Sequence, residues 1–183
     1  MKTQNIAMII AVSVFSFSTP IIGMDNTTKK RMTGEADSMT SAVFAGGCFW
    51  CTESDFEKVE GVVEVISGYT GGSMLNPTYK QVSSGSTRHV EAVKVVYDSQ
   101  RVTYAKLLEI FWTHVNPTDA GGQFVDRGSQ YVSAIFYADE TERRLAERSK
   151  QKLAETGLFA EPIATEILPL GPFYPAEDYH QNY

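Results

Sequence analysis

The chain contains two cysteines, Cys48 and Cys51, and their type and spacing indicate redox or nucleophilic chemistry. They form a C-x-x-C pair directly after Gly46-Gly47, at the predicted start of a helix. Backbone N–H groups and the helix dipole at such a position lower the pKa of a thiol, and the thiolate is the reactive form. One helical turn separates the pair, which is compatible with the Cα separation of about 4.4–6.8 Å in a disulfide. We therefore predict that the two residues form a redox couple.

A C-x-x-C pair has two other common uses, as half of a zinc site or as a structural disulfide of an exported protein. The chain has no second cysteine pair, and His89, His114 and His180 occur singly. A disulfide that closes so short a loop restricts the unfolded chain little. These points favour redox chemistry, and we expect no metal site.

Glu91 is the candidate acid. Strand alternation across residues 89–97 places it on one face with Val93 and Val95. A carboxyl group on an apolar face loses solvation, which raises its pKa and lets it hold a proton near neutral pH. The alternative is a glutamate on an edge strand that faces water.

Other residues near these groups could bind a substrate. Phe49 and Trp50 follow Cys48 and offer an apolar wall to a methyl or thioether group, because sulfur packs well on aromatic rings. Their alternative use is packing in the core. Tyr79 and Tyr131 could donate hydrogen bonds to a departing oxygen, although isolated tyrosines are more often half-buried packing residues. Asp126 and Glu53 are further carboxylates near these segments. A glutamate in the first helical turn, such as Glu53, usually caps the helix or faces solvent.

The elements that must position these residues alternate between strands and helices. Apolar and β-branched runs predict strands at 42–45, 62–66 (ended by Gly68), 89–97, 131–137 and 163–168. Helical spacing and capping residues predict four helices. The first begins after Gly47, the second follows Asn76-Pro77 and is capped by Asn76, the third covers 103–114, and the fourth is capped by Asp139 and ends at 156. We expect an α+β or α/β two-layer sandwich, with helices packed on a mixed sheet, a ferredoxin-like core and long coil segments.

The chain before this domain has two parts. In residues 1–23, Lys2 precedes an apolar run from Ile6 to Phe15, which is the layout of an export signal. The run is too short to span a bilayer comfortably, and no small-x-small cleavage pattern follows it, so an uncleaved anchor is the alternative. Residues 24–40 are polar and of mixed charge, which predicts a flexible linker before a catalytic domain at 41–183. We expect a periplasmic or otherwise exported protein, with a cytoplasmic or membrane-anchored one as the alternative.

Length and charge limit the classes of function. The 183 residues suffice for one compact domain with a real core. The formal net charge of −6 argues against nucleic acid as a partner, because no dense Lys/Arg stripe is present to replace counterions on phosphate.

The sequence of residues 46–53 resembles the signature of the peptide methionine sulfoxide reductase A family, Gly-Cys-Phe-Trp. Further matches follow in the family's order and cover nearly everything from Ser41 onward: residues 68–72, 76–79, 89–93, 126–131 and 176–181. The resemblance implies reduction of methionine S-sulfoxide, free or in proteins, and hence repair of oxidised proteins.

The resemblance also implies roles for the candidate residues. Cys48 attacks the sulfoxide sulfur, while Glu91, assisted by Tyr79 and Tyr131, protonates the oxygen. A nucleophile and an acid are both needed, because the sulfoxide oxygen is a poor leaving group until it is protonated. Phe49 and Trp50 are implied to hold the methyl group, and Asp126 to shape the polar side of the site.

The product on Cys48 is then a sulfenic acid, which condenses with a thiol to a disulfide that thiol exchange reduces. Many members of the family carry a resolving cysteine in a C-terminal extension, whereas here no cysteine follows Cys51. Cys51 is therefore the expected resolving thiol, unless external thiols act on Cys48 directly. We expect a monomer with no bound cofactor and with a thioredoxin-like external reductant, which an exported protein would need in an oxidising compartment.

Two other functions use the same residues. A general disulfide exchanger of the thioredoxin type also has C-x-x-C at a helix start, but does not need Glu91, Tyr79 or Tyr131. A non-catalytic module that binds methionine-rich or oxidised surfaces would use the aromatic wall of Phe49 and Trp50 without turnover. A reactive thiol beside an acid argues against this function, because a binding module does not need either group.

Overall fold

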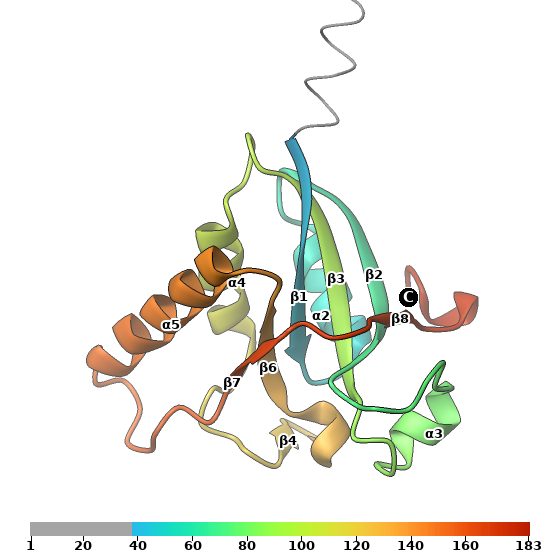
Figure 1. The fold of residues 1–183 in the computed structure, drawn as a ribbon. Helices are drawn as coiled ribbons and strands as arrows, with labels where there is room; N and C mark the ends of the chain where they lie inside the picture. Colours follow the sequence, from blue (N-terminus) through green and yellow to red (C-terminus); the bar gives the residue numbers. More distant parts are fainter. Residues whose placement is uncertain (1–37) are drawn as a thin grey trace, which may run out of the picture.

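The computed structural model describes residues 38–183, so the expected export signal and residues 24–37 of the expected linker lie outside the described residues. A six-stranded sheet, with strand order β7-β6-β1-β3-β2-β8, forms the centre of the domain (Figure 1). The strands of the sheet are β1 (Met39–Gly46), β2 (Val62–Thr70), β3 (Val90–Asp98), β6 (Ser133–Tyr137), β7 (Glu166–Pro169) and β8 (Tyr174–Pro175). The helices are α2 (Phe49–Glu57), α3 (Tyr79–Ser83), α4 (Tyr104–His114) and α5 (Glu140–Glu155). A small hairpin pairs β4 (Gly122–Gln123) with β5 (Asp126–Arg127), and single 3-10 turns occupy Ser129–Tyr131 and Asp178–His180.

The expected ferredoxin-like core is confirmed. Along the chain β1, α2, β2, β3, α4 and β6 follow one another, and in space their strands have the order β6-β1-β3-β2 with antiparallel neighbours throughout. Helix α5 then leads to β7, which pairs with β6 in parallel, as a crossover through a helix allows. The sheet is therefore mixed, as the sequence predicted.

Strand alternation gives the sheet two apolar faces. Phe44, Val93 and Ile135 point to the face that carries α2 and α4 and belong to the main hydrophobic cluster. The other face has a smaller cluster, and Figure 1 shows the coil between β7 and β8 crossing it. The residues of that coil and strand end that pack on the smaller cluster are Leu168, Leu170 and Phe173.

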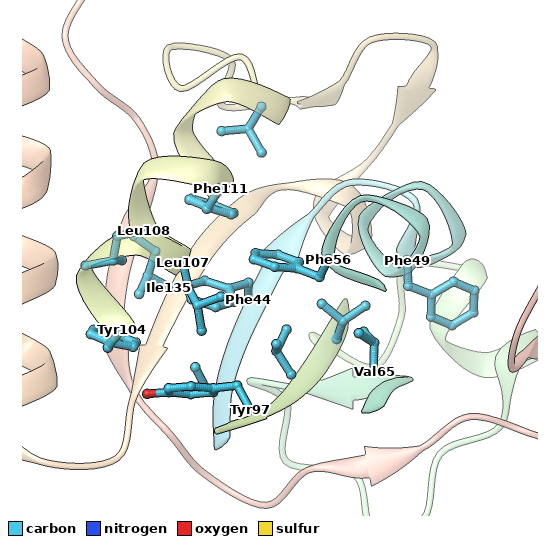
Figure 2. Packing of buried hydrophobic residues seen from close by; sticks show 14 of the residues in the cluster. Phe44, Phe49, Phe56, Val65, Tyr97, Tyr104, Leu107, Leu108, Phe111 and Ile135 are labelled. Atoms are coloured by element: carbon cyan, nitrogen blue, oxygen red, sulfur yellow. The ribbon is translucent and has the colours of Figure 1, made fainter. Parts of the chain in front are cut away.

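Stacked aromatic rings fasten the helices to the sheet. The ring of Phe44 on β1 lies with its centroid 5.0 Å from that of Phe56 on α2 and 5.4 Å from that of Phe111 on α4 (Figure 2). Tyr104, at the start of α4, stacks on the same ring at 6.1 Å. Because Phe56 is on α2, this cluster fixes the helix that begins just after Cys48.

Several predicted boundaries are wrong at particular residues. Strand β2 does not end at Gly68 but continues to Thr70, and β1 begins at Met39, inside the expected linker. Gly68 serves close packing instead: a Cβ there would lie 2.4 Å from the ring of Phe173 and 2.5 Å from the carbonyl oxygen of Tyr174. A glycine inside a strand can mark such a close approach of another segment.

Capping residues show a similar mixture of outcomes. Asp139 caps α5 as predicted, with its carboxylate accepting from the backbone N–H groups of Thr141 and Glu142. The prediction of Asn76 as the cap of α3 is wrong, because the residue at the N-cap is Thr78. The backbone N–H of Thr78 donates to the side chain of Gln81 at 2.9 Å.

Among residues 38–183, none of the helices has the length and the apolar character needed to cross a membrane.

Candidate active site

Cys48 lies at the N-cap of α2, where the chain turns from β1 into the helix. Gly47 makes this turn with φ +93°, and a Cβ there would lie 2.7 Å from the Cβ of Gln123. Only glycine meets both requirements without strain. The first backbone hydrogen bond of the helix joins the Thr52 N–H to the Cys48 carbonyl oxygen at 3.2 Å. The sequence therefore predicted the position of Cys48 at the helix start correctly.

The predicted lowering of the Cys48 pKa is wrong. Burial of the thiol raises its pKa to about 11, although the backbone N–H groups of Cys51 and Trp50 act in the opposite direction. The negative charge of Glu91 adds to the increase. Desolvation outweighs the helix start because an ionised thiol loses more hydration than these two donors replace. Cys48 is therefore a protonated thiol at neutral pH in this state.

Cys51 is exposed, and both cysteines are free thiols. The two residues border one cavity of about 150 Å³, together with Gln123 and Asp126. Cys48 is only partly accessible, whereas Cys51 is open to a partner from solution. The pair therefore combines a shielded thiol with an accessible one.

Glu91 points to the face that carries α2, as predicted, and only 1% of the residue is exposed. The backbone N–H of Phe49 donates to its Oε2 at 3.0 Å, which places the carboxyl group directly under the start of the helix. Burial raises the pKa of Glu91 to about 7, the charge of Asp126 raises it further, and the Phe49 N–H lowers it. The interpretation of Glu91 as a water-facing residue is wrong, and the carboxyl group can hold or release a proton near neutral pH.

The structure brings Tyr79 and Tyr131 to the same carboxyl group. Burial raises the pKa of Tyr79, the charges of Glu91 and Cys48 add to this, and a hydrogen bond with Tyr131 lowers it. Burial and then the charge of Glu91 raise the pKa of Tyr131 to about 12. Tyr131 lies in the 3-10 turn before β6 and not in the strand predicted for it. Both hydroxyls are therefore protonated donors that lie near Glu91.

Phe49 and Trp50 differ in their surroundings. Phe49 is 1% exposed and its ring lies 5.9 Å from that of Tyr69 and 6.2 Å from that of Tyr79. It therefore also packs in the core, as its alternative interpretation proposed. Trp50 is only partly buried, and its ring stacks on Tyr183 at 4.0 Å with an interplanar angle of 12°.

His180 is a residue of this site that the sequence reasoning missed. It is 2% exposed, and its ring lies 4.3 Å from that of Tyr79, 5.2 Å from Phe49 and 5.4 Å from Trp50. Neither ring nitrogen has a hydrogen-bond partner among the described residues. Burial lowers the pKa of His180, so the ring is a neutral, unsatisfied polar group inside an aromatic cluster. Its place in the matching segment 176–181 was the only sequence signal for such a role.

Asp126 and Glu53 have separate roles in the structure. Asp126 begins β5, is partly buried and borders the cavity of the two cysteines. Glu53 is 1% exposed, so the interpretation as a solvated residue is wrong. Its carboxylate accepts from the Ser67 hydroxyl and from the backbone N–H of Asn182, both at 2.7 Å. Glu53 therefore ties the C-terminal segment to the helix of the cysteines.

Within residues 38–183 no group of three or more His, Cys, Asp or Glu side chains is arranged to hold a metal ion. The site that the structure assembles is a thiol next to a buried carboxyl group, two tyrosine hydroxyls and an aromatic wall. Such a set can protonate an oxygen while a thiol attacks the atom that carries it.

Residues 40–183 match the family described as peptide methionine sulfoxide reductase. The chain belongs to this family. A peptide methionine sulfoxide reductase MsrA of Bacillus licheniformis is 54% identical over 148 residues, which are 81% of this chain and 82% of that protein. The Bacillus subtilis protein of the same description is 54% identical over 142 residues, 78% of this chain and 80% of that one.

Solved structures agree with the sequence relatives. Methionine sulfoxide reductase A of Corynebacterium diphtheriae superposes with a TM-score of 0.70 at 38% identity, covering 80% of this chain and 74% of that one. Reduced Mxr1 of Saccharomyces cerevisiae gives a TM-score of 0.74 at 29% identity, covering 79% and 83%. The chain is therefore a peptide methionine sulfoxide reductase, an enzyme that repairs oxidised proteins, and not a general disulfide exchanger or a non-catalytic binder.

Proposed function

We propose that Cys48 takes the oxygen atom from the S epimer of methionine sulfoxide, free or in a protein, while Glu91 supplies the proton to that oxygen. The observation that carries this proposal is the buried Glu91 carboxyl group, held by the Phe49 N–H at 3.0 Å, with a pKa raised to about 7 by burial. At neutral pH such a group can donate and accept a proton with similar ease, which is what general acid catalysis requires.

The proton balance follows from the two pKa values. The Cys48 thiol, whose pKa burial raises to about 11, keeps its proton in the resting enzyme. The Cys48 sulfur attacks the sulfoxide sulfur while Glu91 delivers its proton to the oxygen, and the proton lost by the thiol returns to Glu91. The hydroxyl group then passes to the Cys48 sulfur as its bond to the substrate sulfur breaks. The net reaction converts thiol and sulfoxide into sulfenic acid and thioether, so Cys48 is oxidised and methionine is restored. Tyr79 and Tyr131 donate hydrogen bonds to the oxygen while negative charge develops on it.

The aromatic residues select the substrate. Phe49 and Trp50 hold the methyl group, since a thioether or methyl packs well on aromatic rings. Asp126 lines the polar side of the site. With the oxygen held by the acid groups, the methyl group held by the aromatic rings and the rest of the substrate leading out to solvent, only one configuration at sulfur fits the site. This is the origin that we propose for selectivity toward the S epimer.

We also propose that Cys51 resolves the sulfenic acid and that a thioredoxin-like protein reduces the resulting disulfide, without a bound cofactor. The exposure of Cys51 supports this, because an external thiol needs an accessible sulfur. Mxr1 of Saccharomyces cerevisiae has been solved in complex with Trx2. We expect the enzyme to act as a monomer, which sedimentation at working concentration would test.

The apolar run at Ile6 to Phe15 supports a further proposal, export of the enzyme. Cell fractionation and the mass of the mature N-terminus would test it. Recovery from the periplasm or another exported location would support the proposal, and recovery of the full-length chain from the cytoplasm would contradict it.

The decisive experiment measures turnover of methionine S-sulfoxide with dithiothreitol as the reductant. We expect Cys48→Ser to be inactive and Glu91→Gln to lose a factor of about 10²–10⁴, the usual contribution of a general acid. Glu64→Gln, an exposed glutamate on the neighbouring strand β2, is the matched control and should keep full activity. Equal turnover of the R epimer would contradict the proposed binding mode, and full activity of Glu91→Gln would contradict the proposed acid.

A further inference from the structure

A second pair of ionisable side chains borders the cavity of the two cysteines. His114 is the last residue of α4, and Asp55 lies one turn after Cys51 on α2. The His114 Nε2 atom is 3.6 Å from Oδ1 of Asp55, and both residues line the same cavity of about 150 Å³ as Cys48 and Cys51. The chemistry proposed for Cys48 and Glu91 uses neither residue.

The hydrogen bonds of His114 define which ring nitrogen is free. Its Nδ1 lies 2.9 Å from the carbonyl oxygen of Ile110. A carbonyl oxygen can only accept, so Nδ1 carries the hydrogen. The Thr113 hydroxyl also donates to that carbonyl oxygen, at 2.7 Å, and thus can accept from Nδ1 at 3.0 Å. In the neutral ring, Nε2 therefore has the lone pair and is the basic atom.

The Asp55 carboxylate lies beside the Nε2 atom of this ring without blocking it. The separation of 3.6 Å is an ion-pair distance and exceeds that of a hydrogen bond, so the proton on Nε2 stays available for transfer. Lys58 is the other cation at this carboxylate, with its Nζ 3.9 Å from the same Oδ1. Because the Asp55 side chain is 27% and the His114 side chain 43% exposed, the attraction between the two side chains is modest.

We propose that His114 is the general base for the resolving step, in which it takes the proton of the Cys51 thiol. This inference rests on the proposed function, because it requires a sulfenic acid on Cys48. The Cys51 sulfur attacks the Cys48 sulfur, an S–S bond forms and the S–O bond breaks. The proton accepted by Nε2 then passes to the departing hydroxide, which leaves as water, so that sulfenic acid and thiol become disulfide and water.

The other acid–base groups at this cavity fit the role less well. Asp55 and Asp126 are carboxylates, which are weaker bases than an imidazole. Glu91 is buried under the Phe49 N–H and is committed to the sulfoxide oxygen. Within the part of the chain that the structure describes, His114 is the imidazole that lines the cavity of the accessible thiol.

The test separates the two chemical steps in a single turnover without external thiol. Reduced enzyme is mixed with a slight deficit of a methionine S-sulfoxide amide. Methionine formation reports the Cys48 step, and the loss of two free thiols, with the parallel loss of dimedone-reactive sulfenic acid, reports the Cys51 step. The variants are His114→Gln, Asp55→Asn and, as a matched control on α4, the exposed Glu109→Gln.

We expect His114→Gln to slow thiol loss at least tenfold, with methionine formation unchanged and with partial rescue by added imidazole. Asp55→Asn should slow thiol loss by a smaller factor, and Glu109→Gln should not change it. Rescue by imidazole distinguishes proton transfer from a packing defect at the end of α4.

Unchanged thiol loss in His114→Gln would overturn the inference, as would a sulfenic acid that persists in the unsubstituted enzyme. Failure of the proposed function looks different, since no methionine would form. In that case no sulfenic acid forms on Cys48, and the inference falls together with the proposed function on which it rests.

Discussion

Glu91 illustrates how the burial of one carboxyl group makes the stability of the fold depend on pH. Its burial raises the pKa of the carboxyl group in the folded state to about 7, against an ordinary value of 4.5. At pH values below 4.5 both the folded and the unfolded chain hold this proton, and the residue costs nothing. Between pH 4.5 and 7 the unfolded chain releases the proton first, so the free energy of unfolding decreases as the pH rises. The burial that raises the pKa of Glu91 therefore destabilises the fold at neutral pH.

Glu91→Gln should remove this penalty. The difference between the two pKa values corresponds to about 3 kcal/mol, so the variant should gain up to that amount relative to the unsubstituted enzyme between pH 4 and pH 8. A glutamine oxygen can still accept from the Phe49 N–H, which preserves the local geometry. Urea denaturation of both proteins at the two pH values measures the difference. Parallel pH profiles of stability would show that the carboxyl group ionises normally in the folded state.

Cys48 and Cys51 should differ in reactivity toward an external reagent. Cys48 is partly buried and its pKa is raised to about 11, whereas Cys51 is exposed. Because only the thiolate is alkylated, we expect iodoacetamide at pH 8 to label Cys51 at least ten times faster than Cys48. Peptide mass spectrometry over a time course gives the two rates. In urea the rates should become similar, and faster labelling of Cys48 in the folded enzyme would contradict its raised pKa.

At the scale of elements, the C-terminal segment completes the site because it is tied to β2 and α2. The Gln181 side chain accepts from the Ser67 backbone N–H at 2.9 Å and donates to the Ser67 carbonyl oxygen at 3.0 Å. The Glu177 carboxylate accepts from the Tyr69 hydroxyl and from the Tyr79 backbone N–H, both at 3.0 Å. These bonds hold the segment that carries His180 against the aromatic wall.

Glu53→Ala should loosen this segment. The substitution removes the acceptor of the Ser67 hydroxyl and of the Asn182 N–H, and we expect it to lower the free energy of unfolding by about 2–3 kcal/mol. Since Tyr183 stacks on Trp50, the KM for sulfoxide should rise more than kcat falls. Denaturation and steady-state kinetics measure the two effects. Glu57→Ala, an exposed position on the same helix, is the control, and an equal loss of stability there would argue against the role of Glu53.

At the scale of the whole molecule, one aromatic cluster joins the sheet to the helix that begins directly after Cys48. Phe44 is fully buried and contacts rings from both α2 and α4 (Figure 2). The ferredoxin-like arrangement brings these distant segments together, because strand crossovers place α2 and α4 on the same face of the sheet. The stability of the site therefore depends on a core residue that touches no substrate.

Phe44→Ala should lower the free energy of unfolding by about 3–5 kcal/mol, because the ring leaves a cavity that its neighbours cannot fill. That is a large part of the about 5–15 kcal/mol by which domains are stable. Thermal and urea denaturation measure the loss. The control is Val63→Ala on β2, where 59% of the residue is exposed and we expect a change below about 0.5 kcal/mol.

The amino-acid sequence by itself determined most of the elements of the fold and predicted the residues that the structure brings together at the candidate site. Local rules sufficed for the helix start at Cys48, the alternation that turns Glu91 inward, and the cap at Asp139, because these depend on residues a few positions apart. The family motif identified Tyr79, Tyr131 and Asp126. Each of these signals lies within a short stretch of chain.

Only the tertiary structure decided the balance of forces at the site. The Cys48 pKa is raised rather than lowered because distant segments exclude water from the thiol, which a local helix rule does not include. Glu53 is buried because Ser67 and Asn182 reach it from 14 and 129 residues away. His180 enters the aromatic wall for the same reason, since the C-terminal segment returns to β2. Desolvation and long-range hydrogen bonds depend on contacts between distant segments, and these contacts exist only once the chain has folded.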